Sequence, residues 1–471
     1  MKLKLLSLIA LIGATLLSPG RADQPNFVVI FCDDLGYGDL RAFGNPTIKT
    51  PHLDRMAEEG QKWTQFYSAD PICTPSRAGL LTGRYPIRNG MTSPKRGVLF
   101  PDSSLGLPAV EVTIAEVLKQ RDYATAAVGK WHLGHLPQYL PTAQGFDSYY
   151  GIPYSNDMAR IKDAPNYRQQ TDDPDYYADT NDFDVPLMEN DRVIEQPANQ
   201  NTITRRYTER AVEFIEAHQK QPFFLYLAHS LPHIPLFVST DFRAQSRRGL
   251  YGDVIEEIDW SVGQVLETLR RLDLAKNTVV VFTSDNGPWL SFKTHGGSAG
   301  PLRAGKGTTF EGGQRVPTVF WGPGFVKPGV VDGMGSTIDL LETFAHLAHA
   351  DAPTDRKMDG YDLTPALIGK GPSPREEFFY WTMGKLHAAR SGPWKLHFLQ
   401  REAVQYSRLV PMDHPELYHL EKDISEAYEV SATHPQIVKD LTAKAEAHLE
   451  DTADSLPEQL SARIPNFKYR R

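Results

Sequence analysis

The stretch Phe27-Val-Val-Ile-Phe-Cys-Asp-Asp34 decides the fold class of this chain. Its first six residues are apolar without a break, and two carboxylates follow at once. A run that is apolar at every position is typical of a strand buried on both faces, as in the interior of a mostly parallel sheet. We therefore predict an α/β fold in which polar groups stand where a strand ends.

Other apolar runs repeat this pattern along the chain, and helical patterns lie between them. The expected strands are 124–128, 223–228, 279–283 and 317–321. The expected helices are 113–120, 202–218, 251–272 and 337–348, and the first of them opens with a capping box of Thr113 and Glu116. Strands that alternate with helices predict a large, mostly parallel sheet flanked by helices on both faces.

The character of the sequence changes after residue 369. Residues 369–374, Gly-Lys-Gly-Pro-Ser-Pro, are typical of a linker. Short strand patterns follow at 378–381, 387–390 and 394–398, and a helical pattern covers 435–451. We expect a main domain over residues 23–370 and a smaller C-terminal α+β subdomain over residues 371–471, with an antiparallel sheet and a helix.

The N-terminus has the pattern of a secretory signal peptide over residues 1–22. Lys2 and Lys4 precede an apolar stretch over 5–17, and residues 20–22 offer small side chains for cleavage. A membrane anchor is the alternative, but the apolar stretch is short for a membrane span. We expect a periplasmic or secreted protein without membrane attachment after signal cleavage.

The composition is that of a globular protein: 41% of the 471 residues are hydrophobic and 23% are charged. The net charge is −8, and it becomes −11 when Lys2, Lys4 and Arg21 leave with the signal peptide. An acidic chain argues against broad binding to nucleic acid.

The two cysteines of an exported protein would by default suggest a disulfide. We expect none, because Cys32 lies in an apolar strand and Cys73 has another use.

Polar side chains follow two of the expected strands. Asp33 and Asp34 come directly after the first strand, and Asp285 and Asn286 come just after the strand at 279–283. The carboxyl ends of parallel strands meet at one edge of a sheet, where open α/β folds bind their ligands. Three carboxylates and an amide oxygen suit a hard cation, Ca²⁺ or Mg²⁺, better than zinc.

Residues 73–84 read Cys-Thr-Pro-Ser-Arg-Ala-Gly-Leu-Leu-Thr-Gly-Arg. A lone cysteine is usually a small buried apolar residue. Here it begins a stretch that resembles the signature C-x-P-S-R-x-x-x-L-T-G of formylglycine-dependent type I sulfatases, which are arylsulfatase-like members of the alkaline phosphatase superfamily. Seven specified positions within eleven residues restrict a match far more than a short glycine motif does.

Further blocks are similar to other sulfatase segments. Lys130, His132 and Lys306 lie in Gly129-Lys-Trp-His-Leu-Gly134 and Gly305-Lys-Gly-Thr-Thr309, which match segments that bind sulfate. Ser155 closes Gly151-Ile-Pro-Tyr-Ser155, which resembles a segment with an active-site serine, and His233 lies in Leu231-Pro-His-Ile-Pro235, which resembles a segment with a catalytic histidine. His229 is a weaker candidate nearby.

The resemblance runs from about residue 25 to residue 430. It implies an alkaline-phosphatase-like fold and an enzyme that hydrolyses sulfate esters. It implies that a formylglycine-generating or anaerobic sulfatase-maturing enzyme oxidises Cys73 to formylglycine, whose hydrate attacks sulfur. It also implies a bound metal ion, with Ca²⁺ ahead of Mg²⁺. The implied ligands are Asp33, Asp34, Asp285, Asn286 and the formylglycine at residue 73.

The resemblance also implies a role for the other site residues. Arg77 would stabilise the hydrate and its charge, while Lys130 and Lys306 would neutralise the sulfuryl oxygens. Ser155 would help to bind substrate. His233 would protonate the leaving alcohol with help from Lys306, and His132 would take a proton from the second hydroxyl of the hydrate.

We expect the substrate to be a sulfated carbohydrate of the algal galactan or glycosaminoglycan type. Residues 156–200 are polar and irregular, and their aromatic side chains would suit sugar stacking if this long loop is more than filler. The alternatives are a broad aryl sulfate hydrolase, a phosphatase or phosphodiesterase of the same superfamily, and a glycan-binding protein with a decayed site. Cys73 with one oxygen-rich site argues against the phosphatase, and the complete set of motifs argues against decay.

Overall fold

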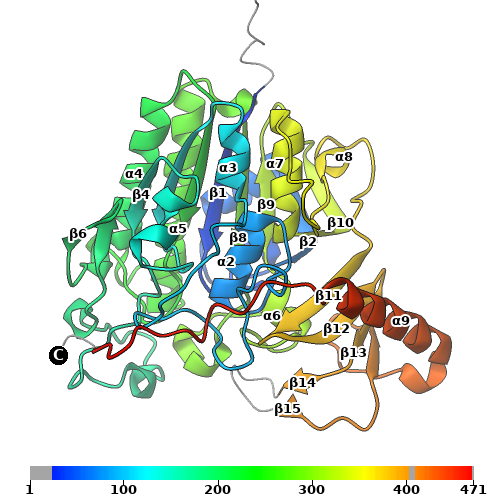
Figure 1. The fold of residues 1–471 in the computed structure, drawn as a ribbon. Coiled ribbons are helices and arrows are strands. Elements are labelled where there is room, and N and C mark those ends of the chain that lie inside the picture. Colours follow the sequence, from blue (N-terminus) through cyan, green and yellow to red (C-terminus); the bar gives the residue numbers. More distant parts are fainter. Residues whose placement is uncertain (1–23, 402–408, 469–471) are drawn as a thin grey trace, which may run out of the picture.

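A computed structural model describes residues 24–401 and 409–468 of the chain (Figure 1). The predicted signal peptide, residues 1–22, lies outside the described residues. A ten-stranded sheet has the strand order β10-β2-β9-β8-β1-β7-β3-β4-β5-β6. Its strands are β1 (Asn26–Cys32), β2 (Gln61–Tyr67), β3 (Ala124–Gly129), β4 (Ser148–Gly151), β5 (Leu187–Glu189), β6 (Arg192–Glu195), β7 (Phe223–Ala228), β8 (Thr278–Ser284), β9 (Thr318–Trp321) and β10 (Gly329–Ser336).

The middle of this sheet is parallel. β8, β1, β7, β3 and β4 run in one direction, and every residue of β1, β3, β7 and β8 is buried. The predicted fold class is thereby confirmed. β9 differs, since it pairs antiparallel with both β8 and β2. The apolar run at 317–321 predicts a buried strand but carries no information on its direction.

Helices cover both faces of the sheet, as predicted (Figure 1). α1, α4 and α5 pack on the face that carries Val28 and Ile30, whereas α2, α3 and α7 pack on the face that carries Phe27 and Val29. Successive residues of a strand point to opposite faces, so one apolar strand supplies both layers. The helices are α1 (Pro51–Glu59), α2 (Cys73–Thr82), α3 (Ile114–Lys119), α4 (Ile203–Ala217), α5 (Leu250–Arg271), α6 (Glu311–Gln314), α7 (Leu340–Ala348), α8 (Thr364–Leu367) and α9 (Pro435–Asp451). The capping box of Thr113 and Glu116 begins α3.

Segment 156–200 is mostly irregular, as expected, but it also forms a hairpin. β5 and β6 pair antiparallel and extend one end of the sheet. Asn190 lies in the tight turn between them with a φ of 54°, a conformation that asparagine adopts readily in two-residue hairpin turns. The sequence pattern does not reveal this hairpin, because β6 is short and lies largely exposed at the sheet edge.

A second, antiparallel sheet lies beside the first, toward the lower right of Figure 1. Its strands, in spatial order, are β11 (Glu377–Thr382), β12 (Lys385–Ser391), β13 (Trp394–His397) and β16 (Glu416–His419). β14 (Gln400–Arg401) and β15 (Leu409–Val410) pair antiparallel and form a separate two-stranded sheet. α9 packs on this sheet and covers the same residues as the predicted helix.

The chain after α9 returns to the loop that follows α2. It runs in red across the lower part of Figure 1, where the backbone N–H groups of Leu456 and Gln459 donate to the carbonyls of Arg88 (3.0 Å) and Gly90 (2.9 Å). The division at residues 370 and 371 stays a prediction, and the last described residues bind the main domain. Within residues 24–401 and 409–468, no helix has the length and apolar character needed to cross a membrane.

Candidate active site

Strand register brings the two acidic segments together. β1 and β8 pair in parallel with Cys32 opposite Ser284, so the residues that follow them lie side by side at the carboxyl edge of the sheet. The backbone N–H of Asp34 donates to Asp285 Oδ1 (3.1 Å). Asn286 Nδ2 donates to Asp34 Oδ1 (2.7 Å). The predicted convergence of these side chains is present in the structure.

Lys130 enters the same edge from the end of β3. Its backbone N–H donates to Ala228 O at 2.7 Å. The preceding Gly129 has a φ of 116°, and a Cβ there would lie 1.8 Å from Ala228 O, so only glycine fits. The buried ammonium of Lys130 donates to Asp33 Oδ2 and, at 3.1 Å, to Ser155 Oγ.

Arg77 lies one turn after Cys73 in α2, a helix in which every residue is buried. Its Nε (3.0 Å) and Nη2 (2.9 Å) both donate to Asp285 Oδ2, and its Nη1 donates to Lys130 O (2.9 Å). Burial opposes the charge of Arg77, but the adjoining carboxylates, Asp285 first, raise the pKa of its guanidinium. Arg77 therefore stays charged and fixes the start of α2 against the carboxylates.

The glycine-rich segment around Lys306 lies against the loop that follows β8. The backbone N–H groups of Lys306 and Gly307 donate to Pro288 O (3.0 Å) and Pro71 O (2.9 Å). This holds the segment against the chain just before Cys73. Lys306 Nζ lies 2.6 Å from Asp34 Oδ1 and 3.3 Å from Cys73 Sγ.

Cys73 lies inside the acidic cluster. One potential ligand atom from each of Asp33, Asp34, Cys73 and Asp285 lies within 4.8 Å of the other three. Both cysteines of the chain are free and buried, in agreement with the prediction of no disulfide. Burial, and then the charge of Asp33, raise the pKa of the Cys73 thiol well above its usual value. The unmodified side chain is thus a neutral thiol, whose sulfur marks where the oxygen atoms of a formylglycine would stand.

His233 faces the cluster with one ring nitrogen. Its Nδ1 lies 2.6 Å from Ile234 O and 3.0 Å from Asn156 Oδ1, which assigns the N–H to Nδ1. Its Nε2 lies 3.3 Å from Ser155 Oγ and 3.7 Å from Asp34 Oδ2. Burial, and then Lys306, lower the pKa of His233 well below its usual range, so the imidazole is neutral at neutral pH.

His132 lies on the α2 side of the site. Its Nε2 lies 2.9 Å from Leu99 O, and its carbonyl accepts a hydrogen bond from Thr74 Oγ1 (3.0 Å), next to Cys73. Its Nδ1 is buried and has no hydrogen-bond partner among the described residues. Burial, and then Lys130, lower the pKa of His132. A neutral ring whose Nδ1 holds a free lone pair can accept a proton.

His229 is not part of this cluster. It is buried and its Nε2 lies 3.3 Å from Ser261 Oγ in α5. Burial alone lowers its pKa to about 4, without a contribution from the charged groups of the site. The structure therefore separates two histidines that lie four positions apart in the sequence.

The cluster fits a hard divalent cation. Asp33 Oδ1 and Asn286 Oδ1 are buried without a hydrogen-bond partner among the described residues. Buried polar atoms rarely lack a partner, and a bound cation would provide one for both oxygens. The buried charged groups balance in number: the carboxylates are Asp33, Asp34 and Asp285, and the cations are Arg77, Lys130 and Lys306. A divalent ion would add two positive charges and prepare the site for an anionic group.

Two residues that contact the site, Asn156 and Trp289, are not predicted by the sequence patterns. Asn156 orients the His233 ring, and its place directly after Ser155 was the only available signal. Trp289 stands against Lys306, with Nζ 4.4 Å from the ring centroid. A tryptophan after Asp285-Asn-Gly-Pro288 gives no signal by itself, because an aromatic residue is more often part of a core.

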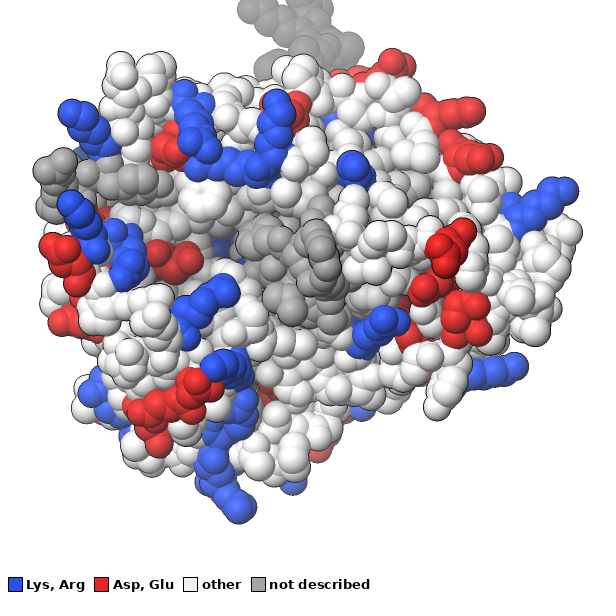
Figure 2. Space-filling model, turned by 90° about the horizontal axis from the view of Figure 1, so that it is seen from below, with Lys and Arg blue, Asp and Glu red and all other residues white. Residues whose placement is uncertain are grey.

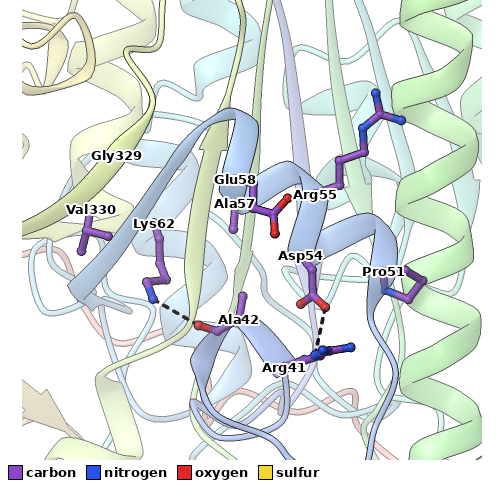
Figure 3. Close-up of a pocket in the computed structure, with 10 residues that line it drawn as sticks. All are labelled: Arg41, Ala42, Pro51, Asp54, Arg55, Ala57, Glu58, Lys62, Gly329 and Val330. Carbon is purple, nitrogen blue, oxygen red and sulfur yellow. Dashed lines mark hydrogen bonds and ion pairs between the residues drawn. The ribbon is translucent and has the colours of Figure 1, made fainter.

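A large surface cavity lies elsewhere. It has a volume of about 760 Å³, and α1 together with Lys62 and Val330 contributes to its lining (Figure 3). Its polar groups contact one another, as in the pair of Arg41 Nε and Asp54 Oδ2 at 3.8 Å. None of the predicted site residues lines it. On the face seen from below, a hollow lies to the left of the middle, and Lys, Arg and acidic side chains stand around it (Figure 2).

Two family models together match most of the chain. The Sulfatase model matches residues 25–350, and the model for the C-terminal region of aryl-sulfatase matches residues 373–467. The first match contains each of the predicted site residues.

Known proteins give the same result. The chain is 40% identical to human arylsulfatase A over 444 residues, which is 89% of this chain and 87% of the relative. It is 41% identical to N-acetylgalactosamine-6-sulfatase of Canis lupus familiaris over 403 residues, which is 83% of this chain and 75% of the relative. The crystal structure of Ps i-CgsB with k-i-k-neocarrahexaose superposes with a TM-score of 0.77 at 32% identity and covers 94% of this chain and 95% of that one. The chain belongs to the sulfatase family, in the alkaline phosphatase superfamily, and is a sulfuric ester hydrolase.

Proposed function

We propose that this sulfatase removes sulfate from a sulfated carbohydrate, with residue 73 converted to formylglycine and Ca²⁺ bound beside it. The observation that carries the proposal is the position of Cys73 Sγ, 3.3 Å from Lys306 Nζ and inside the cluster of Asp33, Asp34 and Asp285. The names of the relatives support the substrate class, since one is an N-acetylgalactosamine-6-sulfatase and another is bound to a neocarrahexaose.

Asp33, Asp34, Asp285 and Asn286, together with residue 73, would hold the cation. When bound, it would polarise a sulfate oxygen and favour ionisation of a neighbouring hydroxyl. A hydrated aldehyde at residue 73 supplies an oxygen nucleophile and a second hydroxyl, which allows sulfate to be expelled by cleavage of a C–O bond. A serine there would lack the second hydroxyl and would need water to attack sulfur.

The buried cations bind and orient the sulfate group. Lys306 Nζ and Lys130 Nζ flank the position of residue 73, each in contact with one aspartate of the pair at the end of β1. Fixed positive charges in a buried site stabilise charge that develops on the sulfuryl oxygens, and they need no reorganisation during the reaction. Arg77, held by Asp285, supports the charge at residue 73.

Two groups face the leaving alcohol. As the S–O bond to the alcohol breaks, the alcohol oxygen needs a proton. His233 directs Nε2 toward the site, but its imidazole is neutral. The ammonium of Lys306 contacts the same Asp34 carboxylate, so we assign the donation to the pair of Lys306 and His233. On the other side, His132 Nδ1 accepts the proton that the second hydroxyl loses when sulfate leaves.

The proposal includes export. The signal-peptide pattern over residues 1–22 would direct the protein to the periplasm or to the medium, where extended sulfated polysaccharides are accessible. It also requires a maturing enzyme, either formylglycine-generating or anaerobic, as a partner in the producing cell.

The test is production with a formylglycine-generating enzyme, followed by assays of sulfate release. N-acetylgalactosamine 6-sulfate, carrageenan oligosaccharides, 4-nitrophenyl sulfate and 4-nitrophenyl phosphate are compared. We expect release from a sulfated sugar and little from the phosphate, and Cys73→Ser should abolish turnover. Faster hydrolysis of the aryl phosphate, or undiminished turnover by Cys73→Ser, would contradict the proposal. Release from the aryl sulfate alone would support the broad aryl sulfate hydrolase instead.

A further inference from the structure

Trp289 is the aromatic neighbour of both groups assigned to the leaving alcohol. Lys306 Nζ lies 4.4 Å from the centroid of its ring. The ring of His233 meets it edge to face at 5.3 Å. His233 and Lys306 are 3% exposed, whereas Trp289 is of intermediate exposure. The tryptophan therefore stands between the buried catalytic groups and the solvent.

The position of Trp289 is fixed by its surroundings. Phe292 packs against it with ring centroids 4.6 Å apart, and the cluster that supports it contains buried Tyr167, Ile234 and Phe292. The carbonyl of the preceding Pro288 accepts the backbone N–H of Lys306 at 3.0 Å. The indole is thus presented as a rigid surface, and its ordering in a complex would cost little conformational entropy.

Geometry limits what can lie against this surface. With the sulfate group held at residue 73 by the buried lysines, the alcohol oxygen of the substrate lies beside its proposed proton donors, His233 and Lys306. Trp289 contacts both of these groups. We propose that Trp289 is a specificity-determining residue, which packs against the C–H face of the sugar ring that carries the sulfate ester. This inference rests on the proposed function and adds the contact that selects a carbohydrate leaving group.

The physical basis is burial of apolar area on an aromatic face. A pyranose ring carries hydroxyls on its rim and C–H groups on its faces, and a large aromatic side chain offers a matching apolar surface. The cationic neighbour Lys306 also contacts the indole. Trp289 could therefore act on the lysine instead of the sugar, and the experiment must separate the two effects.

The experiment compares Trp289→Ala and Trp289→Phe with the wild type. The substrate is the sulfated sugar that the wild type cleaves fastest among N-acetylgalactosamine 6-sulfate, glucosamine 6-sulfate and carrageenan oligosaccharides. We expect Trp289→Ala to lower kcat/KM by about 10- to 100-fold, mainly through KM. Trp289→Phe should stay within about 5-fold of the wild type, because it keeps an aromatic face.

Inhibition by inorganic sulfate separates the sugar from the lysine, since sulfate fills the anion pocket and has no sugar ring. We expect its inhibition constant to change less than about 3-fold in Trp289→Ala. The inference would be overturned if Trp289→Ala raised the inhibition constant of sulfate by the same factor by which it lowered kcat/KM. Trp289 would then act through Lys306. An unchanged kcat/KM would overturn it too.

The matched control is Leu290→Ala. Leu290 is the next residue and is 39% exposed, so its loss should alter kcat/KM by less than about 2-fold. A loss equal to that of Trp289→Ala would contradict a specific role for the indole. If the wild type cleaves none of the sugars, the proposed function fails and this inference fails with it. If the wild type cleaves them and Trp289→Ala cleaves them equally well, only this inference fails.

Discussion

The ammonium nitrogen of Lys306 lies 3.3 Å from the sulfur of Cys73, although 233 positions separate them in the sequence. Backbone contacts maintain this proximity, since the N–H of Gly307 donates to Pro71 O at 2.9 Å, just before Cys73. A cation fixed in this way stabilises anionic character at residue 73 without prior movement. This relationship explains why two short motifs at distant places in the chain form one site.

The two neighbouring histidines should respond differently to the same substitution. We expect His233→Gln to lower kcat by about 10²- to 10³-fold, because the pair of Lys306 and His233 that donates the proton to the leaving alcohol is broken. His229→Gln should keep kcat within about 3-fold, since His229 contacts Ser261 away from the cluster. Rates are normalised to folded, formylglycine-containing protein measured by mass spectrometry. Equal losses in both variants would contradict the assignment.

Ca²⁺ should stabilise the folded protein through its acidic cluster. An ion that binds only the folded state, at a hundredfold excess over its Kd, adds about 2.7 kcal/mol to the free energy of unfolding. Thermal unfolding in Ca²⁺ and in chelator should therefore differ by several degrees. Asn286→Leu, which removes an unpartnered buried oxygen, should reduce this difference.

An exposed carboxylate provides the control for the metal experiment. Asp172 pairs with Lys293 at the surface, so Asp172→Asn should leave the Ca²⁺-dependent shift in Tm unchanged. Equal Tm values for the wild type in Ca²⁺ and in chelator would argue against the metal site.

A buried ion network joins the second sheet to the segment that follows Lys306. Lys395 Nζ lies 2.9 Å from Glu311 Oε1 and 2.9 Å from Glu426 Oε1, and all three side chains are inaccessible to solvent. Lys395→Met would remove the ammonium that the two buried carboxylates share. Glu311 would keep Arg315 Nη1 at 3.4 Å, and Glu426 would keep His397 Nε2 at 2.7 Å. We expect a loss of about 3–5 kcal/mol in the free energy of unfolding, measured by denaturant titration.

Two further variants test this interpretation of the network. Lys395→Met combined with Glu426→Gln should recover part of the loss, because one uncompensated charge is removed. Arg55→Ala breaks an exposed ion pair with Glu59 and should cost less than about 1 kcal/mol. A Lys395→Met variant as stable as Arg55→Ala would show that the buried charges are compensated in another way.

His448 should make the stability of the protein depend on pH. Its Nε2 accepts a hydrogen bond from Trp381 Nε1 at 3.0 Å, and burial, followed by Arg88, lowers its pKa to about 3. In the unfolded chain the pKa is about 6.5. The unfolded chain therefore binds more protons between these values. The stability that neutral His448 contributes is complete above about pH 6.5 and is lost as the pH falls toward 3.

The measurement is the free energy of unfolding of the wild type and of His448→Gln at pH 7 and pH 4. Glutamine keeps an acceptor for Trp381 and does not titrate. Between these two pH values we expect the wild type to lose about 3 kcal/mol more than the variant. Parallel pH dependences in the two proteins would contradict a depressed pKa for His448.

Much of the fold follows from local patterns in the sequence. Apolar runs without alternation predict the buried strands of the sheet, and α9 covers the predicted residues 435–451. The acidic pairs after β1 and β8 predict a shared site, because parallel strands end at the same edge. These features depend on neighbouring residues or on one general rule of sheet geometry, so they can be inferred from sequence alone.

Other features depend on contacts between segments that are distant in the sequence. Examples are the antiparallel direction of β9, the separation of His229 from His233 and the position of Trp289 over Lys306. Residue type alone does not distinguish a histidine or tryptophan that packs in the core from one that faces a substrate. The sequence by itself determined the chemical groups and the sheet edge where they meet. The tertiary structure decided which of them touch, because contact depends on the packing of loops whose local sequences do not encode their partners.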